Sequence, residues 1–314
     1  MRVAIERELG RPISRVFSEI DEVPIAAASL AQVHRALLHD GREVAVKIQY
    51  PDVARLARVD LATLRRVIKI VALLEPNFDI RSIVEEVAHL VGLELDFALE
   101  ARATERVRAA FHGDETVRIP RIYAEFSTPK LIVMEFLHGI RIADVERLRA
   151  AGFDLEKIAA DVGRIYGTMM FRHGFFQGDP HPGNILILPN RVIGLLDFGL
   201  AKELPAGFGA NAARMFVSAM SGDGKGALTA ARALGFDAPA DRPEAVLALI
   251  QALMGADQPG VDLRELFGQS PIKEIPSHFG LIARVMLLLN GLSHRLAPGQ
   301  RLIQASLLSS LPSI

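Results

Sequence analysis

The sequence predicts an α+β fold of two lobes, and three observations support this prediction. The chain has 314 residues, half of them hydrophobic, which suffices for one large core or two closely packed smaller ones. Residues 1–137 mix helix and strand patterns, which indicates a first lobe that contains a sheet. Residues 138–314 are mainly helical in pattern, so we expect a helical second lobe.

Composition argues against several classes of protein. A formal net charge of −1 gives no general attraction for nucleic acid, and the absence of cysteine leaves no disulfide, thiol chemistry or cysteine zinc site. Residues 1–10 are charged and indicate a helix that ends at Gly10 rather than a secretory signal. Apolar stretches such as Val285–Leu289 are too short to span a bilayer. We therefore expect a cytoplasmic location, with peripheral membrane contact left open.

A strand is expected at Glu43–Ile48, where apolar and polar residues alternate after a turn at residues 39–41. Its sequence matches the V-A-I-K pattern, whose lysine binds the α and β phosphates of ATP in kinases. Lys47 is the corresponding residue.

The segment upstream of this strand departs from the kinase pattern. Protein kinases place a G-x-G-x-x-G-x-V loop there, because glycines let the backbone approach the phosphates. With Val33 as the valine of this motif, the glycine positions hold Ala26, Ala28 and Ala31, and Ala27 and Ser29 complete the loop. The methyl groups restrict φ, so we expect a stiffer loop that contacts the phosphates differently. The Ser29 hydroxyl could supply one of these contacts.

Two helices are expected in the rest of the first lobe. Val53–Leu74 has a basic face opposite an apolar one, which indicates a solvated helix or, as the alternative, a membrane-surface helix. Residues 79–111 have a helical pattern that contains Glu94, Asp96 and Glu100. Asp96 and Glu100 are four residues apart and so would share a helix face, where a cation between them would relieve their repulsion. Lys47 is the candidate cation; the alternative is a solvated acidic face.

The first lobe is expected to end in a buried strand that runs into a turn at residues 131–139. In a kinase, such a strand ends at a gatekeeper side chain and at backbone groups that bind adenine. Met134 would be the gatekeeper, and Glu135 and Leu137 would contribute their main-chain carbonyl and amide. The alternative is an ordinary core strand.

The second lobe contains the most informative motif of the chain. Asp179 and Asn184, with Asp197 in a D-F-G triplet, supply two acids and an amide in the order that kinase phosphoryl transfer requires. The first acid accepts or orients the nucleophile's proton, and Asn184 and Asp197 would hold Mg²⁺, which prefers oxygen ligands. Two short strands, Ile185–Leu188 and Val192–Leu196, are expected to form a hairpin between the two metal ligands.

His181 stands where protein kinases have a lysine, two residues after the catalytic aspartate. A histidine is largely uncharged near neutral pH, so stabilisation of the transferring phosphoryl group would be weaker or pH dependent. The alternative is a histidine that caps the turn.

Together these motifs resemble the UbiB family of atypical kinase-like proteins, which are relatives of mitochondrial proteins that support coenzyme Q biosynthesis. Ala26–Ser29 resembles the family's alanine-rich loop, Glu94–Asp96 its E-x-D motif, and residues 178–184 its catalytic loop. Glu100 is similar to the helix acid that pairs with the strand lysine, here Lys47.

This resemblance, which covers nearly the whole chain, implies a two-lobed protein-kinase-like fold that uses ATP and Mg²⁺. It also implies a role in isoprenoid-quinone or lipid metabolism at a membrane surface. The family's N-terminal extension with a K-x-G-Q motif is not found in this sequence. A truncated, a shortened and a divergent member all remain open, and autoinhibition by that extension is in question.

Three classes of function remain open. An ATP-dependent enzyme, either a small-molecule or lipid kinase or an ATPase, is favoured. A protein kinase is disfavoured, because Gly178 replaces the arginine of H-R-D and no Ser, Thr or Tyr lies between Gly199 and Phe216. A non-catalytic nucleotide-binding module is disfavoured by the intact acids and amide. Aminoglycoside and choline kinases share a similar loop and are the nearest rival.

Overall fold

The computed structural model describes residues 1–27, 30–74, 88, 91–92, 95–237, 243–244, 246–247 and 276–312. The chain forms two compact units. The first comprises residues 1–139 and 194–200, and the second comprises residues 140–193 and 201–314. The first unit thus includes the D-F-G segment, which the sequence analysis assigned to the second lobe. The predicted α+β class is confirmed, since the first unit contains an antiparallel sheet and the second is mainly helical.

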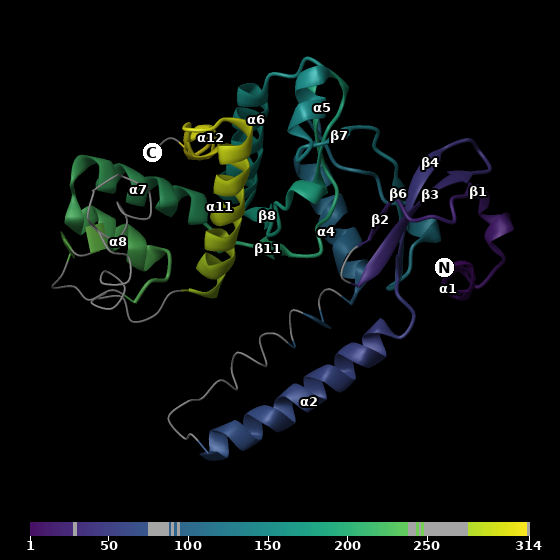
Figure 1. Ribbon diagram of the computed structural model, residues 1–314. Coiled ribbons are helices and arrows are strands. Elements are labelled where there is room, and N and C mark those ends of the chain that lie inside the picture. The colour runs from purple at the N-terminus through teal and green to yellow at the C-terminus, as the bar shows by residue number, and fades with distance from the viewer. Residues whose placement is uncertain are drawn as a thin grey trace. The chain divides into compact units, whose positions relative to one another are not determined.

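The sheet of the first unit has five strands in the order β1-β3-β4-β6, with β2 added to β3. Their bounds are Phe17–Ile20 for β1, Ala26–Ala27 for β2, Ala31–Leu38 for β3, Glu43–Gln49 for β4 and Leu131–Glu135 for β6. All the pairings are antiparallel. The two strands predicted around Lys47 and Met134 are therefore β4 and β6, and they lie side by side (Figure 1).

Alternation along β4 separates its side chains onto the two faces of the sheet. Val44, Val46 and Ile48 belong to a buried core that also contains Ile5 of helix α1 (Arg2–Leu9). Lys47 projects from the opposite face, where Ile132 is its cross-strand partner on β6. The strand thus carries the lysine away from the apolar core.

Helix α1 ends as the sequence predicts. Gly10 adopts the left-handed conformation with φ of 65°, and its N–H donates to the Glu6 carbonyl. Glycine takes this conformation without the steric cost that a side chain would impose.

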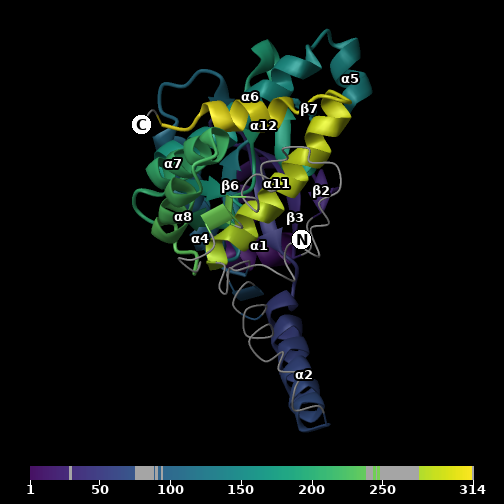
Figure 2. The same cartoon turned by 90° about the vertical axis from the view of Figure 1, so that its left-hand side faces the viewer.

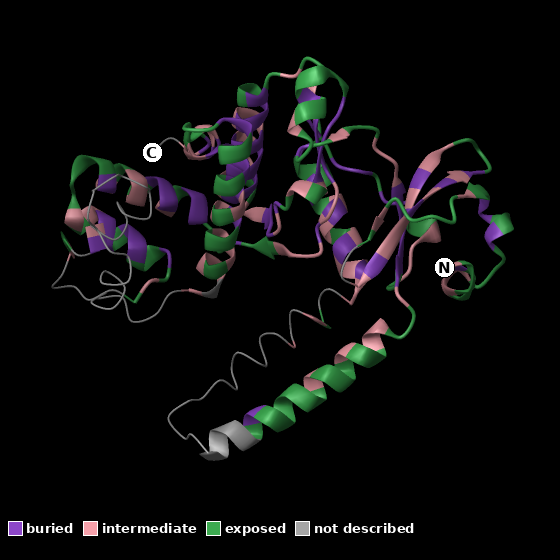
Figure 3. Cartoon of the chain, in the orientation of Figure 1, coloured by how far each residue is buried: buried purple, intermediate pink, exposed green. Residues whose placement is uncertain are grey.

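Helix α2 (Val53–Leu74) leaves the end of β4 as one long helix (Figure 1). Most of its described side chains are exposed, and Ile68 is buried (Figure 3). Leu56, Val59 and Val67 are each about half exposed, so apolar as well as basic side chains of α2 face outward. None of the helices in the described part of the chain is long and apolar enough to span a membrane.

The expected helix over residues 79–111 is wrong as one continuous element. Helix α4 begins at Phe97 and ends at Ala110, and Asp96 has an extended backbone conformation with φ of −110° and ψ of 90°. The Asp96 carboxylate accepts a hydrogen bond from the Ala98 N–H, which makes it the N-cap of α4. Aspartate is favoured there because it satisfies a backbone donor that the helix leaves unpaired. Asp96 is therefore not on a shared helix face with Glu100.

The second unit is built mainly from helices. In its described part the helices are α5 (Val145–Ala150), α6 (Leu155–Gly167), α7 (Phe208–Ser221), α8 (Gly224–Ala233), α11 (Ser277–Leu296) and α12 (Leu302–Ser309). Helix α6 continues into a wider turn at Thr168–His173. The short strands are β7 (Ile140–Arg141), which pairs with β9 (Ile185–Ile187), and β8 (Phe175–Gln177), which pairs with β11 (Ala201–Glu203).

Helix α12 lies against α6 (Figure 1 and Figure 2), and glycines of α6 allow the close approach. A Cβ atom at Gly163 would lie 2.2 Å from the Ile303 carbonyl oxygen, and one at Gly167 would lie 2.5 Å from that of Leu307. Neither distance is compatible with a side chain. The end of the chain is thus held against the helix that leads to the predicted catalytic loop.

The predicted strands around residue 190 are present as β9 and β10 (Ile193–Leu195). Between them Asn190 and Arg191 both have φ near 60°, which non-glycine residues rarely adopt. The Arg191 guanidinium is held by Asp161 of α6 at 2.8 Å, which ties this turn to the helix.

Candidate functional site

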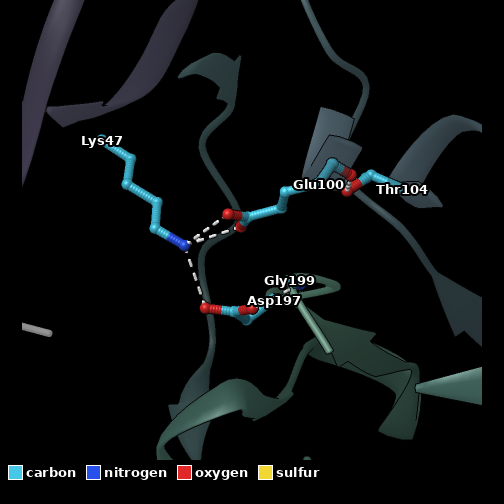
Figure 4. A network of polar contacts seen from close by, with 5 residues as sticks. All are labelled: Lys47, Glu100, Thr104, Asp197 and Gly199. Atoms are coloured by element: carbon cyan, nitrogen blue, oxygen red, sulfur yellow. Dashed lines mark hydrogen bonds and ion pairs between the residues drawn. The ribbon is translucent and has the colours of Figure 1, made fainter. Parts of the chain in front are cut away.

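Three charged side chains from distant parts of the sequence meet in the first unit (Figure 4). The Lys47 Nζ atom lies 2.7 and 2.8 Å from the two carboxylate oxygens of Glu100. It lies 3.0 Å from Oδ2 of Asp197. The structure therefore joins the lysine of the V-A-I-K pattern with the helix acid and the aspartate of D-F-G.

The two carboxylates differ in their access to solvent. The side chains of Lys47 and Glu100 are only 8% and 6% exposed, whereas that of Asp197 is 35% exposed. Glu100 is thus enclosed as the permanent partner of the lysine. Asp197 keeps an accessible side that a ligand could reach.

The charges of the network set the pKa values of its members. Burial lowers the pKa of Lys47, but Glu100 and Asp197 outweigh it, so that the pKa of Lys47 is raised above its ordinary value. Burial raises the pKa of Asp197, but Lys47 and the Gly199 N–H outweigh it, so that the pKa of Asp197 is lowered. The network therefore holds an ammonium group and a carboxylate at neutral pH.

Local contacts fix the start of α4, and with it Glu100. The Phe97 N–H donates to the Pro129 carbonyl at 2.9 Å, and the Gln49 side chain donates to the Leu95 carbonyl at 2.6 Å. The Phe97 ring lies 5.0 Å from Lys47 Nζ, which adds a cation–π contact. The Thr104 hydroxyl donates to the Glu100 carbonyl one turn further along the helix. The acid is thus presented by an anchored first turn.

Asp197 is held by the turn that follows it. Its Oδ1 atom accepts the Gly199 N–H at 2.9 Å, while Oδ2 faces Lys47. A carboxylate that is fixed in this way and partly exposed fits a hard cation such as Mg²⁺, which takes one or two protein oxygens together with phosphate and water. Among the described residues, no three His, Asp or Glu side chains gather as a ready-made metal site.

Half of the alanine-rich loop is described. Ala26 and Ala27 form β2, opposite Val33 and Gln32 of β3, whereas Ala28 and Ser29 lie outside the described residues. Ala31 is only 1% exposed and packs in a core cluster with Phe97, Ile122, Ile132 and Met134. This alanine, the first residue of β3, contributes to the packing of β3 against β6 and α4.

The predicted adenine-binding segment, residues 134–137, forms a hinge that begins in the last two residues of β6. Met134 is 7% exposed in the same cluster as Ala31 and Phe97. The Glu135 side chain pairs with Arg118 at 2.5 Å, and its N–H donates to the Arg121 carbonyl. The backbone of Leu137 makes no hydrogen bond to the described part of the chain.

The predicted catalytic loop lies in the second unit. Asp179 is partly buried and makes an ion pair with Arg284 of α11 at 3.2 Å. His181 caps the turn, because its Nδ1 atom accepts the Gly183 N–H at 3.1 Å. The Asn184 N–H donates to the His181 carbonyl at 2.8 Å, and Asn184 itself is partly exposed. His181 thus caps this turn, and the catalytic role expected for it stays a prediction.

Sequence reasoning missed a buried support beneath this loop. The Tyr166 hydroxyl of α6 donates to the Gln177 side chain, and both residues are almost fully buried. Burial and the negative charge of Asp179 raise the pKa of Tyr166 well above its ordinary value. A tyrosine eleven residues from a glutamine carries no sequence signal for this bond. Arg284 also carries no sequence signal for its contact, because it lies 105 residues from its partner.

Glu94, which the sequence analysis places in the E-x-D motif, lies outside the described residues.

The chain is similar in sequence to several known proteins. Residues 1–231 match the model of the ABC1 atypical kinase-like domain. AarF domain-containing protein kinase 1 of Xenopus laevis is 40% identical over 209 residues, which cover 65% of this chain and 40% of that protein. The protein ACTIVITY OF BC1 COMPLEX KINASE 7, chloroplastic, of Arabidopsis thaliana is 39% identical over 202 residues, which cover 64% of this chain and 29% of that protein. The chain thus spans well under half the length of these two relatives.

A solved structure extends the similarity to the fold. The complex of Rv3197 with erythromycin, from Mycobacterium tuberculosis, superposes with a TM-score of 0.71 at 27% sequence identity. The match covers 95% of this chain and 82% of that one, which supports the predicted two-lobed kinase-like fold. The chain belongs to the ABC1 family of atypical kinase-like proteins, which is the UbiB family that its motifs resemble.

Proposed function

We propose that this protein binds ATP together with Mg²⁺ and acts as an atypical kinase or ATPase. The observation that carries the proposal is the Lys47–Glu100–Asp197 network. Kinases need a strand lysine held by a helix acid, close to the aspartate of D-F-G, before the phosphates can be bound productively. In this chain the carboxylates of Glu100 and Asp197 both lie within 3.0 Å of Lys47 Nζ.

Each residue of the motifs then has a role. Lys47 would bind the α and β phosphates, and Asp179 would accept or orient the proton of the attacking hydroxyl or water. Asn184 and Asp197 would hold the metal, because both offer oxygen donors and both are partly exposed. When bound, Mg²⁺ would neutralise charge on the β and γ phosphate oxygens.

Adenine would be recognised by the hinge. The unpaired backbone of Leu137 and the main-chain carbonyl of Glu135 are the candidate groups, with Met134 as the gatekeeper behind them. Ala26 to Ser29 would cover the phosphates in place of a glycine-rich loop. Because these groups would recognise the base, we expect adenine nucleotides as the ligands.

The acceptor that we propose is a lipid or an isoprenoid-quinone precursor, reached at a membrane surface. Support comes from the family resemblance and from α2, where Leu56, Val59 and Val67 are exposed beside basic residues such as Arg58. Helices of this kind lie in membrane interfaces and bind anionic lipids. Hydrolysis of ATP without an acceptor would be the background reaction.

Formation of ADP from ATP by the purified chain tests the proposal, because ADP is released both when phosphate is transferred to an acceptor and when ATP is hydrolysed. The assay compares the wild type with Asp179→Asn, with and without Mg²⁺ and with vesicles that contain anionic lipid or a prenylated phenol. We expect Mg²⁺-dependent turnover that Asp179→Asn abolishes and that Glu115→Gln, an exposed acid in the first unit, leaves unchanged. Equal turnover by the wild type and Asp179→Asn would contradict the assignment. Nucleotide binding without any turnover would favour a regulatory module.

A second candidate is a kinase for a bulky small molecule. The observation that favours it is the similarity to Rv3197, whose structure contains erythromycin. Addition of erythromycin and an aminoglycoside to the same assay would separate the two candidates, because only a substrate would be phosphorylated. Phosphorylation of a model protein, but of neither lipid nor antibiotic, would instead indicate a protein kinase.

A further inference from the structure

Arg284 of α11 contacts the aspartate that the proposed function assigns as the catalytic base. Its Nη2 atom lies 3.2 Å from Oδ1 of Asp179, although the two residues are 105 positions apart. Both belong to the second unit. Arg284 also lies beyond residues 1–231, the part of the chain that matches the family domain.

The position of Arg284 follows from the packing of its helix. Val285, Leu289, Leu292 and Leu296 recur at helical spacing along α11 and are all nearly fully buried. Helix α11 contacts α6, and α12, which follows it, is clamped on α6 through Gly163 and Gly167. The guanidinium is therefore presented to Asp179 by a helix that is packed against α6 and α12 within the second unit.

The Arg284 guanidinium has more N–H donors than its contact with Asp179 uses. A guanidinium carries five N–H groups, and within the described part of the chain the Arg284 side chain has Asp179 as its hydrogen-bond partner. The Arg284 side chain is 52% exposed. Its charge therefore faces solvent as well as the aspartate.

The catalytic loop itself contains neither lysine nor arginine. No Lys or Arg occurs between Gly174 and Leu188. His181, which stands where protein kinases have a lysine, uses Nδ1 to accept the Gly183 N–H. A cation beside Asp179 must therefore come from another segment, and Arg284 of α11 supplies one.

We propose that Arg284 is a positioning residue that orients the Asp179 carboxylate toward the phosphoryl acceptor. This inference rests on the proposed function. A base must lie within hydrogen-bond reach of the proton that it takes, and a small displacement of a reacting group lowers the rate steeply. An ion pair between partly exposed groups contributes little to stability, so loss of Arg284 should affect turnover far more than folding.

The test compares Arg284→Gln, Arg284→Lys and Arg284→Ala with Arg295→Gln, an exposed arginine on the same helix. We expect Arg284→Gln to lower kcat about 10-fold while the KM for ATP and the melting temperature change little. Lysine should restore part of the rate. Millimolar guanidinium added to Arg284→Ala should also raise it, which a purely structural role would not permit. Arg295→Gln should match the wild type.

Two results would contradict the inference. Turnover of Arg284→Gln at or above the wild-type rate would exclude a positioning role, and a faster rate would identify an inhibitory contact instead. A fall in kcat that is accompanied by a fall in melting temperature, and that guanidinium does not rescue, would identify a structural role. Absence of Asp179-dependent turnover in the wild type would contradict the proposed function itself. The two failures are therefore distinguishable.

Discussion

Lys47 and Asp197 lie 3.0 Å apart although 150 residues of sequence separate them. The fold brings them together by placing Lys47 on the face of β4 that is opposite the α1 core and Asp197 just after β10. Glu100 joins them from the anchored first turn of α4. The enclosed Glu100 holds the lysine, and the more exposed Asp197 remains open to a ligand. This division of roles leads to the predictions below.

Lys47→Met should destabilise the protein as well as weaken nucleotide binding. It leaves the buried Glu100 carboxylate without its cation, and breaking a buried pair in this way costs about 3–5 kcal/mol. The free energy of unfolding from urea denaturation measures the effect. Lys157→Met is the matched control, because its pair with Asp154 is exposed and should contribute about 0–1 kcal/mol. Equal losses in the two variants would show that Lys47 is not buried against Glu100.

The stability contributed by Asp197 should depend on pH in a defined direction. Because its pKa is lowered, this contribution is complete above the ordinary aspartate value of 3.8 and is lost as pH falls through the lower folded value. The pKa of Lys47 is raised, so the stability that its charge contributes is complete below the ordinary lysine value of 10.5 and is lost only at higher pH. The difference in unfolding free energy between the wild type and Asp197→Asn should therefore be constant near neutral pH and shrink toward about pH 3. A difference that grows on acidification would contradict the ion pair.

Gly163→Ala should loosen the contact between α6 and α12. Its Cβ atom would meet the Ile303 carbonyl oxygen at 2.2 Å, and overpacking of this kind costs about 1–3 kcal/mol. Gly291→Ala on α11 is the control, because nothing lies within 4 Å of its Cβ and alanine favours a helix by about 0.5–1 kcal/mol. Thermal unfolding of the two variants should move in opposite directions. A Gly163→Ala variant as stable as the wild type would disprove the close approach of the helices.

Ala28→Gly should alter nucleotide binding, because glycine would remove a methyl group from the loop that is expected to cover the phosphates. Affinities for ATP and ADP from calorimetric titration measure the change. Ala231→Gly, buried in α8 of the second unit, should cost stability without altering nucleotide preference. An unchanged ATP to ADP preference in Ala28→Gly would remove this loop from the site.

Local patterns predicted much of the first unit. Alternation identified β4 and Lys47, Gly10 marked the end of α1, and the apolar run before the turn at residues 136–139 identified β6. The hairpin strands around Asn190 also followed from short apolar runs beside a proline. In each case the signal lies within a few residues, so one sequence suffices.

Features that depend on distant contacts were missed or misjudged. The helical pattern of residues 79–111 concealed the N-cap at Asp96, because a capping aspartate and an acid on a helix face look alike in sequence. The Arg284–Asp179 pair joins segments 105 residues apart, and the Tyr166–Gln177 bond is defined only by burial. Motifs predicted the candidate site residues, whereas the contacts that support them depend on tertiary packing.

Calorimetric titration of Mg²⁺-ATP into the wild type and Asp197→Asn tests the central claim most directly. Circular dichroism establishes that both proteins are folded at the titration temperature, and Glu115→Gln serves as the surface control. The account predicts that the wild type and Glu115→Gln bind ATP with Mg²⁺, that omission of the metal weakens this binding, and that Asp197→Asn does not bind. Binding of Mg²⁺-ATP by folded Asp197→Asn with wild-type affinity, or no binding by the wild type, would contradict it.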